Sequence, residues 1–290
     1  MKYLLFLPLV AMLMWSCGNG SDKETDNNAD TVMVDNDSAE VMNEVVYQIP
    51  SPEDFFSLLN NKTLKFKSGI VHDDKKQYES RAGKELNMGV YLSDMTYLNT
   101  FGEMKTAVRY FARIREMADQ LGLSAAIPEQ TLKKLEDSSA NTDSLRKVSD
   151  ESFFNVIQAL EEAGNGKSLA LIMTAGWVET IYLSQQLVDM KKFDYKDPLI
   201  QRLCSQKITY NNVVKNLERF NDQQDVKAIY DQLQQLSTFF DGLTREEIKT
   251  QQDTTKNIIG TPSLWKSEKE AFSKFMEQIL SIRKFIVEQA

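Results

Sequence analysis

The chain has 290 residues, a formal net charge of −8 at pH 7 and 42% apolar residues, which is enough to form a globular core. Its 6 Pro and 12 Gly are few for this length and favour long helices over many short strands and turns. The acidic balance argues against nucleic-acid binding, because that activity needs clustered Lys and Arg to displace counterions.

The first residues are predicted to be a targeting segment. Lys2 is followed by an apolar run over residues 3–15, which is typical of a secretory signal peptide and short for a membrane span. The run ends in Met-Trp-Ser-Cys-Gly, which resembles the lipobox of bacterial lipoproteins, with Ser16 before the cleaved bond. We therefore predict a lipoprotein signal peptide over residues 1–16 and a lipid anchor, such as palmitate, on Cys17. An ordinary signal peptide or a membrane anchor is the alternative.

An acidic tether is predicted to follow over residues 17–48. After Cys17 it contains eight Asp or Glu and one Lys, a net charge of −7. High charge and little apolar surface predict disorder, and a coil of this length spans on the order of 30 Å. An acidic stretch after the lipobox also resembles surface-export signals of Bacteroidota lipoproteins. The expected location is the cell envelope, anchored to the outer membrane, with the periplasmic face and the cell surface both left open.

Residues 49–290 are predicted to form a single all-α domain, a multi-helix bundle or helical-hairpin array of about eight helices. Ser51 and Pro52 are the cap and first turn of a short helix, and an extended connection follows it. A small β-hairpin or irregular flap is expected within the polar, Thr-rich residues 245–260. Further helices are expected over residues 74–99, 106–121, 128–137, 141–163, 167–190, 197–221, 223–241 and from 261 to the C-terminus.

Local sequence patterns give expectations for three further side chains. Cys204 lies in an apolar helical pattern and is predicted to be a small buried hydrophobe instead of a reactive thiol. His72 precedes two aspartates, but a solvated helix start is favoured over a metal site. Arg113 is expected on the outer, charged face of its helix. No catalytic residue, cofactor or metal is predicted.

Two carboxylates lie inside the most apolar helical segments. Asp94 recurs with apolar residues at every fourth position from Leu86 to Leu98, and Glu179 falls between Ala175 and Leu183 in the same way. The two segments share the pattern acid-x-x-Tyr-Leu, in which the tyrosines are Tyr97 and Tyr182.

These four residues, Asp94, Tyr97, Glu179 and Tyr182, are the candidate polar core or ligand site. In one interpretation the two acids face each other and bind a cation or polar ligand, with raised pKa values. In the other, which we favour, each acid accepts hydrogen bonds from tyrosine hydroxyls or an arginine and fixes helix register, because a buried carboxylate is costly unless it is paired.

A wider set of residues around both acids carries a family resemblance. The set comprises Gly89-Val-Tyr91, Asp94-x-x-Tyr97, Arg109-Tyr110, Ala118-Asp119-x-Leu121-Gly122 and Gly176-Trp177-Val-Glu179-x-x-Tyr182. Over roughly residues 86–187 the chain resembles uncharacterised all-helical Bacteroidota envelope lipoproteins. The resemblance implies the fold and location and no catalytic residue or cofactor, because no activity is established for that family.

Two functions are compatible with these features. The first is a non-catalytic, membrane-tethered module that binds an envelope protein, a glycan or a small ligand. The alternative is a carboxylate-based envelope enzyme such as a glycan hydrolase with two acids, which needs an open cleft between its carboxyl groups. The partner expected on sequence grounds is the membrane itself, through the lipid anchor; the oligomeric state is not indicated.

Overall fold

The structure, a computed structural model, describes residues 50–57, 64–137, 142–248 and 263–289, all within the compact unit Asp37–Ala290. The predicted fold class is confirmed, since helices dominate and one small two-stranded hairpin accompanies them. The predicted signal peptide, Cys17, the tether and its boundary at residues 48 and 49 lie outside the described residues. Within the described ranges, no helix combines the length and apolar character that a membrane crossing requires.

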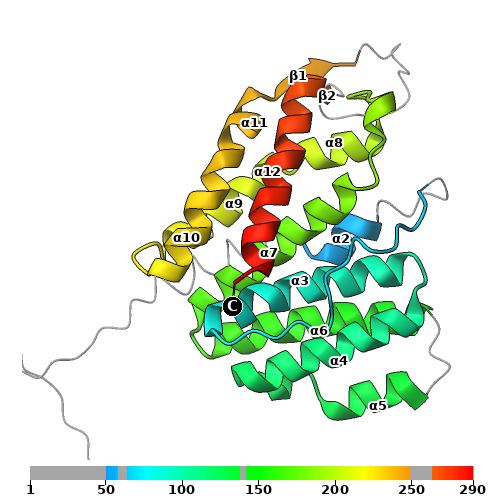
Figure 1. Cartoon of the computed structure of the whole chain (residues 1–290), viewed down its shortest axis with the longest axis vertical. Coiled ribbons are helices and arrows are strands. Elements are labelled where there is room, and N and C mark those ends of the chain that lie inside the picture. Colours follow the sequence, from blue (N-terminus) through cyan, green and yellow to red (C-terminus); the bar gives the residue numbers. More distant parts are fainter. Residues whose placement is uncertain (1–49, 58–63, 138–141, 249–262, 290) are drawn as a thin grey trace, which may run out of the picture. The chain divides into compact units, whose positions relative to one another are not determined.

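Figure 1 shows the arrangement of these elements. In chain order they are α2 (Pro52–Ser57), α3 (Arg81–Thr100), α4 (Met104–Leu121), η1 (Ser124–Ala126), α5 (Glu129–Asp137), α6 (Thr142–Glu162), α7 (Gly166–Gln185), η2 (Met190–Lys192), α8 (Pro198–Cys204), α9 (Lys207–Glu218), α10 (Gln224–Leu233), η3 (Gln234–Leu236), α11 (Ser237–Gly242), β1 (Thr244–Glu247), β2 (Ser263–Lys266) and α12 (Lys269–Val287).

The central pair of helices is α3 and α7, and the two share the most extensive contact in the unit. Both are buried on every side over most of their length. The sequence of α7 is apolar all round, as expected for such a helix, whereas α3 also buries polar residues, among them Glu85, Asn87 and Asp94. They cross where Gly89 meets Ile172 and Gly176. A Cβ atom added to Gly89 would lie 2.1 Å from the carbonyl oxygen of Ile172, so only glycine allows this separation of the two backbones.

Several of the other helices pack on this pair. Helices α2, α4 and α6 pack on α3, whereas α9 and α12 pack on α7, and α12 also reaches α3. Figure 1 shows α3, α4 and α6 running side by side, while α10, α11 and α12 run together along another direction. The junction of α3, α7 and α12 is therefore enclosed by helices.

One predicted helix begins later than expected. Residues 74–80 are not helical, and α3 begins at Arg81 after Ser80, whose side chain accepts a hydrogen bond from the N–H of Gly83. The earlier residues extend a non-helical segment, residues 64–79, that we call the strap. The helix prediction failed there because the backbone of the strap is bound by side chains of α3 and α4, such as Tyr91, which donates to the carbonyl of Asp73 over 2.7 Å.

Other predicted helices were also wrong in part: the helix expected over 167–190 ends at Gln185, and the one expected over 223–241 is interrupted by η3. The helix expected over 197–221 is divided into α8 and α9 at Ser205 and Gln206, where the Gln206 side chain accepts a hydrogen bond from the indole N–H of Trp177. The helix expected from residue 261 begins only at Lys269, because residues 263–266 form β2. A small hairpin is present, with β1 antiparallel to β2, but β2 lies beyond the predicted range of 245–260, of which residues 249–260 are not described.

Cys204 is fully buried, as predicted, and burial raises the pKa of its thiol to about 12. We expect this thiol to stay unreactive toward a water-soluble disulfide reagent at pH 8 in the folded protein, since only the thiolate attacks. A Cys17→Ser variant leaves Cys204 as the reporting thiol in the chain. The coloured thiol that the reagent releases on reaction should appear only when urea unfolds the protein. Its appearance in native buffer within minutes would contradict the buried placement of Cys204.

Candidate functional site

Asp94 of α3 and Glu179 of α7 meet at the centre of the unit. Both side chains have no exposed surface, and their carboxyl groups lie close enough to shift each other's pKa. The crossing at Gly89 and Gly176 brings the two helices close enough for this contact, since Ser93, next to Asp94, donates to the carbonyl of Gly176 over 2.7 Å.

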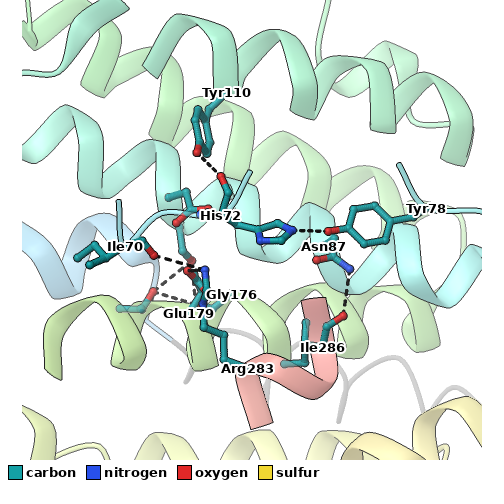
Figure 2. A network of polar contacts seen from close by, with 12 residues as sticks. Ile70, His72, Tyr78, Asn87, Tyr110, Gly176, Glu179, Arg283 and Ile286 are labelled. Carbon is teal, nitrogen blue, oxygen red and sulfur yellow. Dashed lines mark hydrogen bonds and ion pairs between the residues drawn. The ribbon is translucent and has the colours of Figure 1, made fainter. Parts of the chain in front are cut away.

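An arginine from the last helix completes this acid pair. Arg283 of α12 binds Glu179 with both arms of its guanidinium, Nε to Oε2 at 2.7 Å and Nη2 to Oε1 at 2.9 Å. Figure 2 shows the guanidinium between Glu179 and the strap residue Ile70, to whose carbonyl Nη2 also donates over 3.4 Å. Its carbon lies 4.1 Å from the ring centre of Tyr182. Such a forked, desolvated pair fixes the positions of all three groups.

The other acid of the pair, Asp94, binds the strap. The backbone N–H of His72 donates to Oδ2 of Asp94 over 3.0 Å, and the carbonyl of His72 accepts from the Tyr110 hydroxyl of α4, as Figure 2 shows for the latter pair. Further along the strap, the Tyr97 hydroxyl accepts from the N–H of Lys67 at 3.0 Å. These groups bind main-chain atoms of the strap, so they recognise its path instead of its side chains.

The sequence-predicted site residues therefore come together in part. Asp94 and Glu179 face each other, and Tyr182 lies against Arg283. Tyr97 belongs to a neighbouring contact, because its hydroxyl bonds to Lys67. Asp94 accepts a hydrogen bond from the backbone N–H of His72, whereas the hydroxyls of Tyr91, Tyr97 and Tyr110 bond to main-chain atoms of the strap.

Charge in this site is governed by burial. Burial raises the pKa of Asp94, and the adjacent Glu179 raises it further. Burial also raises the pKa of Glu179, while Arg283 opposes that rise. The pKa of Arg283 is raised because its attraction to Glu179 outweighs the cost of burial.

His72 is not placed as a metal ligand. Its Nε2 atom lies 2.5 Å from the hydroxyl of Tyr78, and Asp74 is paired with Arg109 at 3.0 Å. Burial, assisted by the charge of Arg283, lowers the pKa of His72 to about 4, so its ring is neutral at pH 7. Among the described residues, no group of three or more His, Cys, Asp or Glu side chains is arranged to hold a metal ion.

Three functional side chains escaped the sequence reasoning. Arg283 falls between buried isoleucines of α12, and a lone arginine beside an apolar stripe is the signal that could have revealed it. Glu85, a third buried acid, accepts from Ser168 at 2.5 Å and from Arg81 at 2.8 Å. Arg113 was predicted to face solvent, which is wrong: it is 5% exposed and donates to the carbonyl of Lys76 in the strap over 2.5 Å.

Fold and site together define an all-α bundle whose central helices are joined by a buried acid pair and an arginine. Comparison with protein-family models, with curated proteins and with solved structures gives no match. The resemblance to envelope lipoproteins therefore rests on the sequence patterns alone.

Proposed function

We propose that this chain is a lipid-anchored protein of the bacterial cell envelope whose helical part is a non-catalytic binding or interaction module. The observation that supports it is the engagement of the acid pair. The two acids are the most site-like residues of the sequence, yet both are fully buried and bonded to Arg283 and to the strap. Their role is structural, which leaves binding to the outer surface.

The same geometry disfavours the glycan hydrolase alternative for these two acids. Glycosidases place their carboxyl groups roughly 5–9.5 Å apart on either side of a cleft that admits the sugar. Here the carboxyl groups of Asp94 and Glu179 are adjacent, and neither side chain presents any surface to solvent. A polymeric substrate has no route to them without separating α3 from α7.

The anchor is tested by replacing the residue that would carry it. In cells fed a labelled fatty acid, the natural chain should incorporate label and fractionate with the outer membrane, because two or more acyl chains hold a protein stably at a bilayer. A Cys17→Ser variant should lose the label and remain in the unprocessed or soluble fraction. Equal labelling of both chains would refute the lipobox interpretation.

The binding role is tested on the outer surface. Large apolar side chains that are exposed there include Phe154 at 49%, Ile208 at 65% and Leu280 at 50%. A photo-crosslinking amino acid is placed at each position in living cells. At a position that contacts a binding partner, it should give one discrete crosslinked adduct whose amount reaches a plateau as expression of this protein increases. Asn155, exposed beside Phe154, is the matched control position. Absence of a saturable adduct from every position would count against the proposal.

A further inference from the structure

The acid pair contains more acid groups than cations to balance them. Two carboxyl groups, those of Asp94 and Glu179, face each other without solvent. Arg283 is the cation that the structure places against them. Two adjacent buried carboxylates rarely ionise together, because like charges in a low-dielectric site raise the free energy of the second ionised form.

The other polar groups around Asp94 add no second positive charge. From the strap, His72 offers its backbone N–H, and its ring is neutral because burial and Arg283 lower its pKa to about 4. The remaining titratable groups that face the site are tyrosines whose pKa values are raised by burial, so they are neutral as well. They are Tyr91 and Tyr97 of α3, Tyr110 of α4 and Tyr182 of α7.

The hydrogen bonds identify which acid is neutral. Both oxygens of Glu179 accept from the guanidinium of Arg283, at 2.7 and 2.9 Å, which is the geometry of an ionised carboxylate. Asp94 accepts from His72 through Oδ2, whereas no N–H or O–H group of the described residues donates to its Oδ1. A proton on Oδ1 would let this buried, unpartnered atom donate a hydrogen bond to the adjacent carboxylate of Glu179.

We propose that Asp94 is a proton-binding site: in the folded protein at neutral pH its Oδ1 carries a proton that is donated to the ionised Glu179, and this proton joins α3, α7, α12 and the strap at one junction. The ligand is a single proton. The consequence is a pH-dependent junction, which weakens when alkaline pH removes the proton and leaves two anions beside Arg283.

The sign of the pH dependence follows from linkage. The pKa of Asp94 is higher in the folded protein than in the unfolded chain, where it is about 3.9. The stabilisation it provides is therefore complete below pH 4 and is lost as pH rises toward the folded value. Over that range the folded state binds one more proton than the unfolded state, so the unfolding constant should rise about tenfold per pH unit from this group alone.

Asp94→Asn isolates this effect, because an amide has the shape of the neutral acid and can donate to Glu179 in its place. Urea unfolding of the full chain from pH 5 to pH 9 gives the unfolding constants of both proteins. We expect the unfolding constant of the natural chain, divided by that of Asp94→Asn, to rise about tenfold per pH unit from pH 5 until Asp94 ionises. A ratio that stays flat from pH 5 to pH 9, or an Asp94→Asn chain that cannot fold, would overturn the proposal.

Two further measurements separate the proton from a merely structural role. Infrared spectra of the natural protein at pH 7 should contain the carbonyl band of a protonated carboxylic acid. The band should be absent in Asp94→Asn and retained in Asp231→Asn, which removes an exposed carboxylate paired with Lys227. Glu179→Gln removes the negative charge that pairs with Arg283, and it should raise the unfolding constant by more than roughly tenfold. A missing band in the natural protein, or equal effects of both amide variants, would refute the assignment.

Discussion

A Gly89→Ala chain should lose roughly 3 kcal/mol of its free energy of unfolding, at the upper end of the cost of overpacking a core. The added Cβ atom would lie 2.1 Å from the carbonyl oxygen of Ile172 and 2.8 Å from the amide nitrogen of Gly176. Both are backbone atoms, so no rotation of a side chain relieves the clash, and α3 must move away from α7. The intrinsic preference of helices for alanine over glycine, about 1 kcal/mol, is too small to compensate.

Two other glycines provide matched controls for the urea unfolding measurement. A Cβ atom on Gly176 would lie 3.3 Å from the carbonyl oxygen of Gly89, so Gly176→Ala should cost less. Gly242 has no atom within 4 Å of such a Cβ and no positive φ, and Gly242→Ala should be within about 0.5 kcal/mol of the natural chain. Equal stability of all three variants would show that the two helices do not cross at Gly89.

Much of the fold was predictable because local sequence signals agree with tertiary packing. Helix α4 ends at Gly122, which has the left-handed conformation of a helix C-cap. Helix α2 begins after Ser51, whose side chain caps its first turn. The start of α3 was not predictable in this way. Asp73 and Asp74 are good helix-start residues, but long-range bonds from Tyr91 and Arg113 hold the strap in a non-helical path, and no local pattern reports such bonds.

The site was predictable to the extent that it depends on helical periodicity. Periodicity placed Asp94 and Glu179 on buried faces, and the structure confirms that both are buried. It could not supply Arg283, which lies 104 residues from Glu179 in the chain, nor the backbone of His72. Partners that come from another helix, or from main-chain atoms, depend on how the elements assemble, which a single sequence without its structure does not reveal.

The ion pair of Arg283 and Glu179 should be the other position of large effect. Arg283→Met removes the charge but keeps much of the apolar stem, and we expect a loss of about 3–5 kcal/mol at pH 8, because Glu179 remains buried without a counterion. Lys227→Met is the matched control, since it breaks a pair whose side chains are 59% and 53% exposed. Such surface pairs contribute less than about 1 kcal/mol, so the control should unfold close to the natural chain.

The defect of Arg283→Met should depend on pH with a definite sign. Without Arg283, no cation offsets the effect of burial, so the pKa of Glu179 rises further above its unfolded value of about 4.3. The stability that Glu179 contributes is then complete below its unfolded pKa and is lost as pH rises toward its folded pKa. The variant should therefore be less impaired at pH 5 than at pH 8. Adding Glu179→Gln to the variant should restore part of the loss at pH 8, because the buried charge is removed. Urea unfolding at both pH values measures this, and a defect that is independent of pH and unrelieved in the double variant would mean that Arg283 acts through packing alone.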